Sequence, residues 1–159
     1  MAKSNQIRRI FFAEDNVADV VLVREALERQ SLNCELTAYP NAQAAILAAE
    51  RCGTDGYPVP DLMLVDLNLP WGHGCDVLAA AARNPALNSV RKAVLSSFVG
   101  SPSDVEKARR LGATGFIMKP ANLEEFLDDV GRQIAACWNP RPPHLSNCET
   151  DSNLVDQPE

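Results

Sequence analysis

Polar side chains suited to metal and phosphate chemistry follow four separate apolar runs of the sequence. They are Glu14 and Asp15, Asp66 and Asn68, Ser96 and Ser97, and Lys119, which Pro120 follows. In an open parallel α/β sheet, ligands bind beyond the carboxyl ends of the strands. If the four runs are neighbouring strands of such a sheet, these side chains converge on one acidic pocket that contains a single lysine.

The three carboxylates of this pocket predict a metal ion. Glu14, Asp15 and Asp66 would repel one another at short range, and at least one pKa would rise unless a cation neutralised them. Ligation by oxygen atoms, with positions left for water, favours Mg²⁺, with Mn²⁺ as a substitute. Phosphoryl transfer needs such a cation because its chemistry depends on positioning and on neutralising spread negative charge.

The sequence indicates that a side chain accepts the phosphoryl group. It contains neither a GxxxxGK[ST] loop nor a dinucleotide-binding glycine pattern, so a nucleotide of its own is not expected. Asp66 ends the most apolar run, where its carboxylate could attack phosphorus and form an acyl phosphate. Lys119 and the Ser96 hydroxyl would then bind phosphoryl oxygens.

The elements that must position these residues follow from an alternation of short β-rich runs with longer amphipathic stretches. Strands are expected at 9–13, 35–39, 62–66, 92–96 and 115–118, and helices at 17–30, 41–51, 74–84, 101–111 and 123–138. Ser101 or Ser103 is expected to cap the fourth helix. The last helix carries one apolar stripe from Leu123 to Trp138. The predicted fold class is α/β, a doubly wound, five-stranded parallel sheet with five helices.

Length and charge limit the other classes of function. With 159 residues, 46% of them hydrophobic, and a net charge of −6, one acidic domain is expected. The negative charge argues against general electrostatic binding of nucleic acid or of an anionic membrane. The sequence shows no apolar run of membrane-spanning length and no signal peptide, so a cytoplasmic protein is expected. Its five cysteines have no CxxC spacing, which argues against a disulfide framework or a zinc site.

The domain is predicted to end near Trp138. Residues 1–138 form the expected domain, and 139–159 form an arm that holds four of the eleven prolines and half of the net charge. This composition is typical of an extended segment, so no output domain is expected. His73 and His144 have no partners at metal-ligand spacing and are expected at the surface.

Taken together, the motifs resemble the receiver domain of two-component response regulators. The resemblance is carried by ED at 14–15, LVDLNLP at 64–70, VLSS at 94–97 and GFIMKP at 115–120. The segment AEDNVADVVLVREAL, the DLNLPWGHG loop and the missing output domain are most similar to single-domain regulators paired with phytochrome histidine kinases. The resemblance implies a flavodoxin-like sheet with strand order 2-1-3-4-5.

The resemblance also implies a phosphoacceptor switch rather than an enzyme. A sensor histidine kinase, of the phytochrome type, would phosphorylate Asp66, and hydrolysis would remove the phosphate. Asp15 and Asp66 would ligate Mg²⁺ directly, Glu14 would act through a water, and Asn68 would offer its backbone carbonyl. Phe116 would be the aromatic residue whose rotamer follows phosphorylation. Glu14 stands where Asp is commoner in the family, which lengthens its reach by one methylene.

Three apolar residues are predicted to contact partners. Val21 falls among charged residues of the first helix, and with Val20 it is expected to meet the kinase helix that bears the phosphohistidine. Trp138 either covers the sheet edge or, by the resemblance, contacts a second copy in a homodimer. Output would be a protein contact, relay to another His-bearing protein, or use as a phosphate sink.

Two other functions fit parts of the pattern. One is an aspartyl-phosphate phosphatase of the haloacid dehalogenase type. Such enzymes use an Asp-x-Asp pair, but Asn68 occupies the second position and leaves no general acid there. The other is an adaptor that works without phosphorylation and keeps the pocket only for structure.

Overall fold

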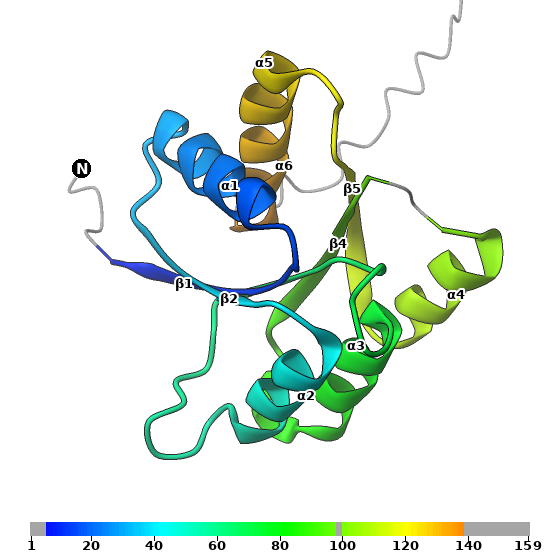
Figure 1. Cartoon of the computed structure of the whole chain (residues 1–159). Helices are drawn as coiled ribbons and strands as arrows, with labels where there is room; N and C mark the ends of the chain where they lie inside the picture. The colour runs from blue at the N-terminus through cyan, green and yellow to red at the C-terminus, as the bar shows by residue number, and fades with distance from the viewer. Residues whose placement is uncertain (1–5, 98–99, 139–159) are drawn as a thin grey trace, which may run out of the picture.

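Five parallel strands form the centre of the protein in a computed structural model that describes residues 6–97 and 100–138 (Figure 1). They are β1 (Arg8–Ala13), β2 (Cys34–Tyr39), β3 (Leu62–Val65), β4 (Arg91–Ser96) and β5 (Ala113–Met118). Their order is β2-β1-β3-β4-β5, and every neighbouring pair is parallel. The predicted α/β fold and strand order are confirmed.

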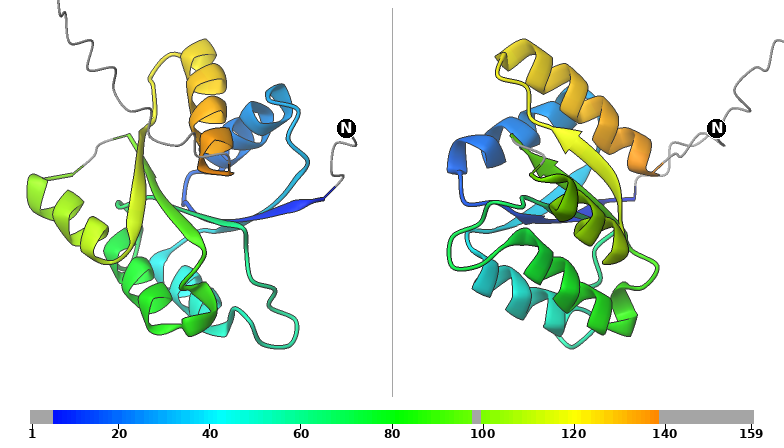
Figure 2. Two further views of the ribbon diagram at one scale, coloured as in Figure 1. Left: turned by 180° about the vertical axis from the view of Figure 1, so that it is seen from behind. Right: turned by 90° about the vertical axis from the view of Figure 1, so that its right-hand side faces the viewer.

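Helices cover both faces of this sheet (Figure 2). One face carries α1 (Val17–Arg29) and the last helical stretch, which comprises α5 (Leu123–Glu125), the π-helical turn η2 (Phe126–Val130) and α6 (Gly131–Trp138). The other carries α2 (Ala42–Arg51), α3 (Gly74–Arg83), the short 3₁₀ turn η1 (Pro85–Leu87) and α4 (Pro102–Arg110). The layers follow from the right-handed crossovers that connect parallel strands.

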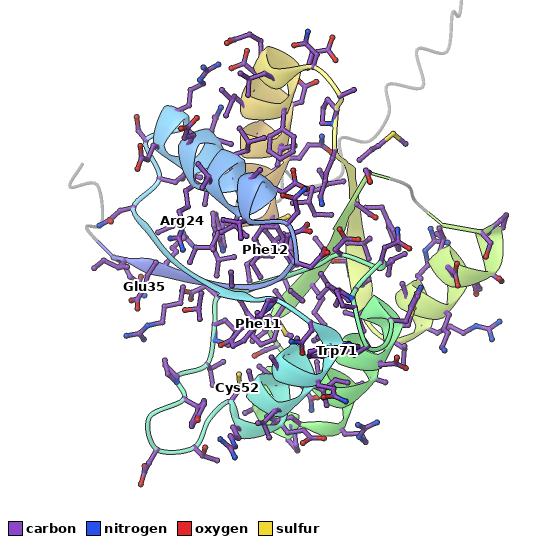
Figure 3. All side chains as sticks on the ribbon, in the orientation of Figure 1. Phe11, Phe12, Arg24, Glu35, Cys52 and Trp71 are labelled. Atoms are coloured by element: carbon purple, nitrogen blue, oxygen red, sulfur yellow. The ribbon has the colours of Figure 1, made fainter. Side chains whose placement is uncertain are left out.

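Side-chain alternation along β1 divides the core into two apolar clusters. Phe11 packs with Met63 and the residues of α2 and α3, whereas Phe12 packs with Leu64 and the residues of α1 and α6. Figure 3 shows Phe11 and Phe12 on opposite sides of the sheet. Every residue of β3 is buried, as expected for a central strand covered on both faces.

Side-chain caps set the starts of the helices at the carboxyl edge of the sheet. Asn16 caps α1, and Ser101 caps α4 as predicted. His73, expected at the surface, is half-buried, and its Nδ1 accepts the backbone N–H of Cys75 at 3.1 Å. The Asp76 carboxylate accepts the His73 N–H in return, which completes a capping box for α3. His144 lies outside the described residues.

The last helical stretch differs from the single uniform helix that the sequence predicts. A π-helical turn separates α5 from α6, and Gly131 follows it. A Cβ at Gly131 would stand 2.7 Å from the Ala26 carbonyl oxygen of α1, so the close packing of the two helices requires glycine. Leu123 is exposed, and the buried stripe begins only at Phe126. Spacings of three and four residues did not distinguish this insertion from a regular helix.

None of the helices in the described part of the chain combines the length and the hydropathy needed to cross a membrane. The predicted arm at 139–159 lies outside the described residues, and the division of the chain at Trp138 stays a prediction.

Candidate functional site

Four neighbouring strands place the predicted site residues at one edge of the sheet. Glu14 and Asp15 follow β1, Asp66 follows β3, Ser96 ends β4 and Lys119 follows β5. Because the strands are parallel and adjacent in the order β1-β3-β4-β5, their carboxyl ends meet at this edge. The side chains that the sequence separates by up to 105 positions are therefore brought together.

Three carboxylates form a cluster in which a cation could bind. Glu14, Asp15 and Asp66 each offer one oxygen atom, and these atoms lie within 4.8 Å of one another. Glu14 is 2% exposed and Asp66 is 5% exposed, whereas Asp15 is open to solvent. The predicted set of acidic ligands thus fits a hard divalent cation, because it combines oxygen donors with an open side for water.

Lys119 lies among these carboxylates and is itself buried. Its ammonium nitrogen donates to Asp66 Oδ2 at 2.9 Å, to Asp19 Oδ2 at 2.8 Å and to Glu14 Oε2. Burial alone would lower the pKa of Lys119, but the hydrogen bonds to Asp19, Glu14 and Asp66 outweigh it and raise the pKa. The lysine is therefore held in its charged form.

Glu14 responds to the same surroundings in the opposite way. Its burial raises the pKa from the ordinary 4.5 to about 7, and the charge of Asp66 adds to the rise. The hydrogen bond and charge of Lys119 oppose this increase without cancelling it. Glu14 is thus poised to change protonation near neutral pH.

Asp66 is held by donors at both of its carboxylate oxygens. Oδ1 accepts the Ser96 hydroxyl at 3.0 Å and the backbone N–H of Asn68 at 2.9 Å, while Oδ2 accepts Lys119. The backbone is also fixed: a Cβ at Gly74 would stand 2.3 Å from the Asp66 carbonyl oxygen, so glycine allows α3 to begin against this loop. The side chain is thereby fixed in one orientation.

Within the described part of the chain, the other predicted residues add no side-chain hydrogen bond to this network. Ser97 is exposed, and within the described part of the chain it makes no side-chain hydrogen bond. Asn68 is exposed and meets Asp66 through its backbone N–H; its predicted carbonyl ligation stays a prediction. Val20 is half-buried and Val21 is exposed on α1. The half-buried ring of Phe116 lies 5.6 Å from the Arg109 guanidinium, which stacks over it.

Trp138 packs against the core beside α1 and α6, and the Arg8 guanidinium lies 5.1 Å from its ring centre. It therefore covers the sheet, which was one of its two predicted roles. Its contact with a second copy stays a prediction.

Asp19 belongs to the site but was not predicted. It lies in the first turn of α1, and its carboxylate accepts a hydrogen bond from the Lys119 ammonium group. A usable signal was its spacing of four residues from Asp15, because α1 starts at the carboxyl edge and its first turn must face that edge.

A family comparison decides what kind of domain this is. Residues 10–131 match the model of the response regulator receiver domain. The chain belongs to the response regulator receiver family. The resemblance inferred from the four strand-end motifs is therefore confirmed, and the geometry described above is that of a receiver domain.

Individual relatives agree with this assignment. The chain is 32% identical over 137 residues to the response regulator Rcp1 of Synechocystis sp., which covers 86% of this chain and 92% of Rcp1. The phosphorylated cyanobacterial phytochrome response regulator RcpA has a similar structure, with a TM-score of 0.74, 30% identity and coverage of 84% and 95%. The Mn²⁺-bound form of Rcp1 gives a TM-score of 0.71 at 30% identity, with coverage of 82% and 94%.

Proposed function

We propose that this receiver domain accepts a phosphoryl group on Asp66 from a sensor histidine kinase in a two-component pathway. The observation that carries the proposal is the buried Asp66 carboxylate, held by Ser96 and Lys119 beside a cluster of acidic oxygens. A phytochrome-type kinase is the expected donor, since the relatives include a phytochrome response regulator. A cytoplasmic location follows from such a donor.

The transfer step can be written from the residues in place. A carboxylate oxygen of Asp66 bonds to phosphorus while the P–N bond to the kinase histidine breaks, and the imidazole nitrogen keeps that electron pair. Ser96 and Lys119 already donate to the two Asp66 oxygens, so both lie within reach of phosphoryl oxygens attached there. Their donors then stabilise the charge that moves onto the phosphoryl group.

Glu14, Asp15 and Asp66 would hold the divalent cation, with Mg²⁺ expected and Mn²⁺ as a substitute. When bound, the cation would supply positive charge that offsets the negative charge of the phosphoryl oxygens. The relative Rcp1 has a Mn²⁺-bound form, which supports binding of a divalent cation by this chain. Lys119 neutralises part of the same acidic charge before any metal binds.

Phosphorylation would act on shape through Ser96 and Phe116. The Ser96 hydroxyl would turn from Asp66 Oδ1 to a phosphoryl oxygen, and the half-buried Phe116 ring would move into the space released. That movement would break the stacking of Arg109 on the ring, and because Arg109 belongs to α4, the surface of α4 would change. The output is expected as a protein contact or as relay to another His-bearing protein, from a homodimer that uses the Trp138 edge.

The direct test is transfer from a phosphorylated phytochrome-type histidine kinase. We expect Mg²⁺-dependent loss of label from the kinase and gain of label on this chain, abolished by Asp66→Asn and retained by Asp55→Asn, which changes an exposed loop carboxylate. Steady turnover of a phosphomonoester would instead favour a phosphatase. Unchanged labelling in Asp66→Asn would refute the assignment of the acceptor.

A further inference from the structure

The opposite, amino edge of the sheet holds a second buried lysine. Lys92 is the second residue of β4 and is 5% exposed. Its ammonium nitrogen donates to the Leu87 carbonyl at 2.8 Å and to the Val90 carbonyl at 3.1 Å, both in the connection that follows α3. An ammonium group carries three N–H donors, so these two carbonyls leave one donor for another acceptor.

Comparison with Lys119 shows what Lys92 lacks. The Lys119 side chain is also buried, but it has three carboxylates around it. Lys92, in contrast, has no carboxylate within ion-pair distance among residues 6–97 and 100–138. A buried charge without a counter-charge is costly, and burial accordingly lowers the pKa of Lys92. An anion from outside the chain would provide the missing charge.

A pocket of about 410 Å³ adjoins this ammonium group. Its lining includes Asn88, Ser89, Arg91, Lys92, Gly112 and Thr114, a set that contains one amide, two hydroxyls and two basic groups. Gly112 has φ +104°, and a Cβ there would stand 4.0 Å from Lys92 Nζ. The glycine therefore keeps the approach to the ammonium group free of a side chain.

We propose that this pocket binds a small oxyanion, either inorganic phosphate or the phosphate group of a small metabolite. The free N–H of Lys92 would donate to one oxygen, and the Ser89 and Thr114 hydroxyls and the Asn88 amide are the donors for the others. Because the chain carries a net charge of −6, such binding must come from local donors rather than from the overall charge. The site is separate from the acidic cluster, which lies beyond the other end of β4.

The proposal is tested on the full chain by titrating inorganic phosphate at constant ionic strength in the presence of EDTA, with amide shifts followed by NMR. EDTA removes divalent cations, and without them the acidic cluster repels phosphate. The result therefore does not depend on the proposed phosphoacceptor. We expect saturable shifts at Ser89, Gly112 and Thr114, with Asn68 unchanged. Lys92→Met should weaken binding by about tenfold or more, because it removes a charged hydrogen-bond donor.

Matched variants make the outcome decisive. Lys107→Met removes an exposed lysine of α4 and should leave the affinity unchanged. Thr114→Glu alters an exposed position of the pocket and should abolish binding by repulsion, even if Lys92→Met fails to fold. A second titration with a phosphomonoester separates the two sources by affinity. Shifts that do not saturate would overturn the proposal, and so would a folded Lys92→Met or Thr114→Glu variant that binds phosphate as tightly as the unaltered chain.

Discussion

Protonation of Glu14 should control metal binding near neutral pH. The carboxylate must be ionised to bind the cation. Its pKa is raised to about 7 before metal binds, so a proton competes with the metal below that pH. At about pH 6 roughly nine molecules in ten carry the proton, so the apparent affinity should fall about tenfold for each unit below the pKa. Above the pKa the affinity should become independent of pH.

The raised pKa of Glu14 also makes the stability of the protein depend on pH, in the opposite direction to its metal affinity. A carboxyl group whose pKa rises on folding stabilises the folded state at low pH and loses that contribution as pH increases from the ordinary 4.5 to about 7. The metal-free protein should therefore lose the contribution of Glu14 over this range, while bound metal should restore stability at higher pH. Thermal unfolding with and without Mg²⁺ measures both effects.

Calorimetric titration of Mg²⁺ in two buffers of different ionisation enthalpy gives the number of protons released. We expect nearly one proton at about pH 6 and nearly none at about pH 8. In Glu14→Gln the release should disappear and the metal should bind more weakly at every pH. Equal affinity at both values of pH, with no proton released by the unaltered chain, would show that Glu14 does not titrate as described.

Three further predictions concern partners and packing. Val21→Glu should slow phosphotransfer from the kinase and leave labelling by acetyl phosphate intact. Leu47→Glu, at a similarly exposed position of α2, should change neither reaction. Equal loss of both reactions in Val21→Glu would rule out docking at this position. Ile134→Ala should reduce the free energy of unfolding by about 2–5 kcal/mol in denaturant titrations, because it leaves a cavity in a buried site, while exposed Leu123→Ala should change it by less than about 0.5 kcal/mol. Trp138→Ala should shift the chain from dimer to monomer in sedimentation. An unchanged sedimentation coefficient would show that Trp138 does not contribute to a dimer interface.

The fold and most of the site could be predicted because they depend on local patterns. Strand ends are marked by a change from apolar to polar residues, and parallel pairing brings those ends to one edge. Asp66, Ser96 and Lys119 were found in this way, and the structure joins them by hydrogen bonds. A single motif would have been weak, but their order along the chain was specific.

Other features depend on distances between elements that the sequence does not contain. The spacing of Asp19 from Asp15 could place it at this edge of the sheet, but its bond to Lys119 depends on how close α1 lies to the end of β5. Lys92 lies in the strand predicted at 92–96, but the strand pattern did not indicate that the connection after α3 accepts hydrogen bonds from its buried ammonium group. The π-helical turn lies directly before Gly131, where the last helical stretch packs closely on α1, and no pattern within that stretch indicated either feature.

The central claim is that Asp66 is the side chain that accepts phosphate. Intact-mass measurement after incubation with acetyl phosphate and Mg²⁺ tests it most directly. The account predicts the gain of one phosphoryl group, its loss on hydroxylamine treatment as expected for an acyl phosphate, and no gain in Asp66→Asn or without the metal. A gain of the same size in Asp66→Asn would contradict it.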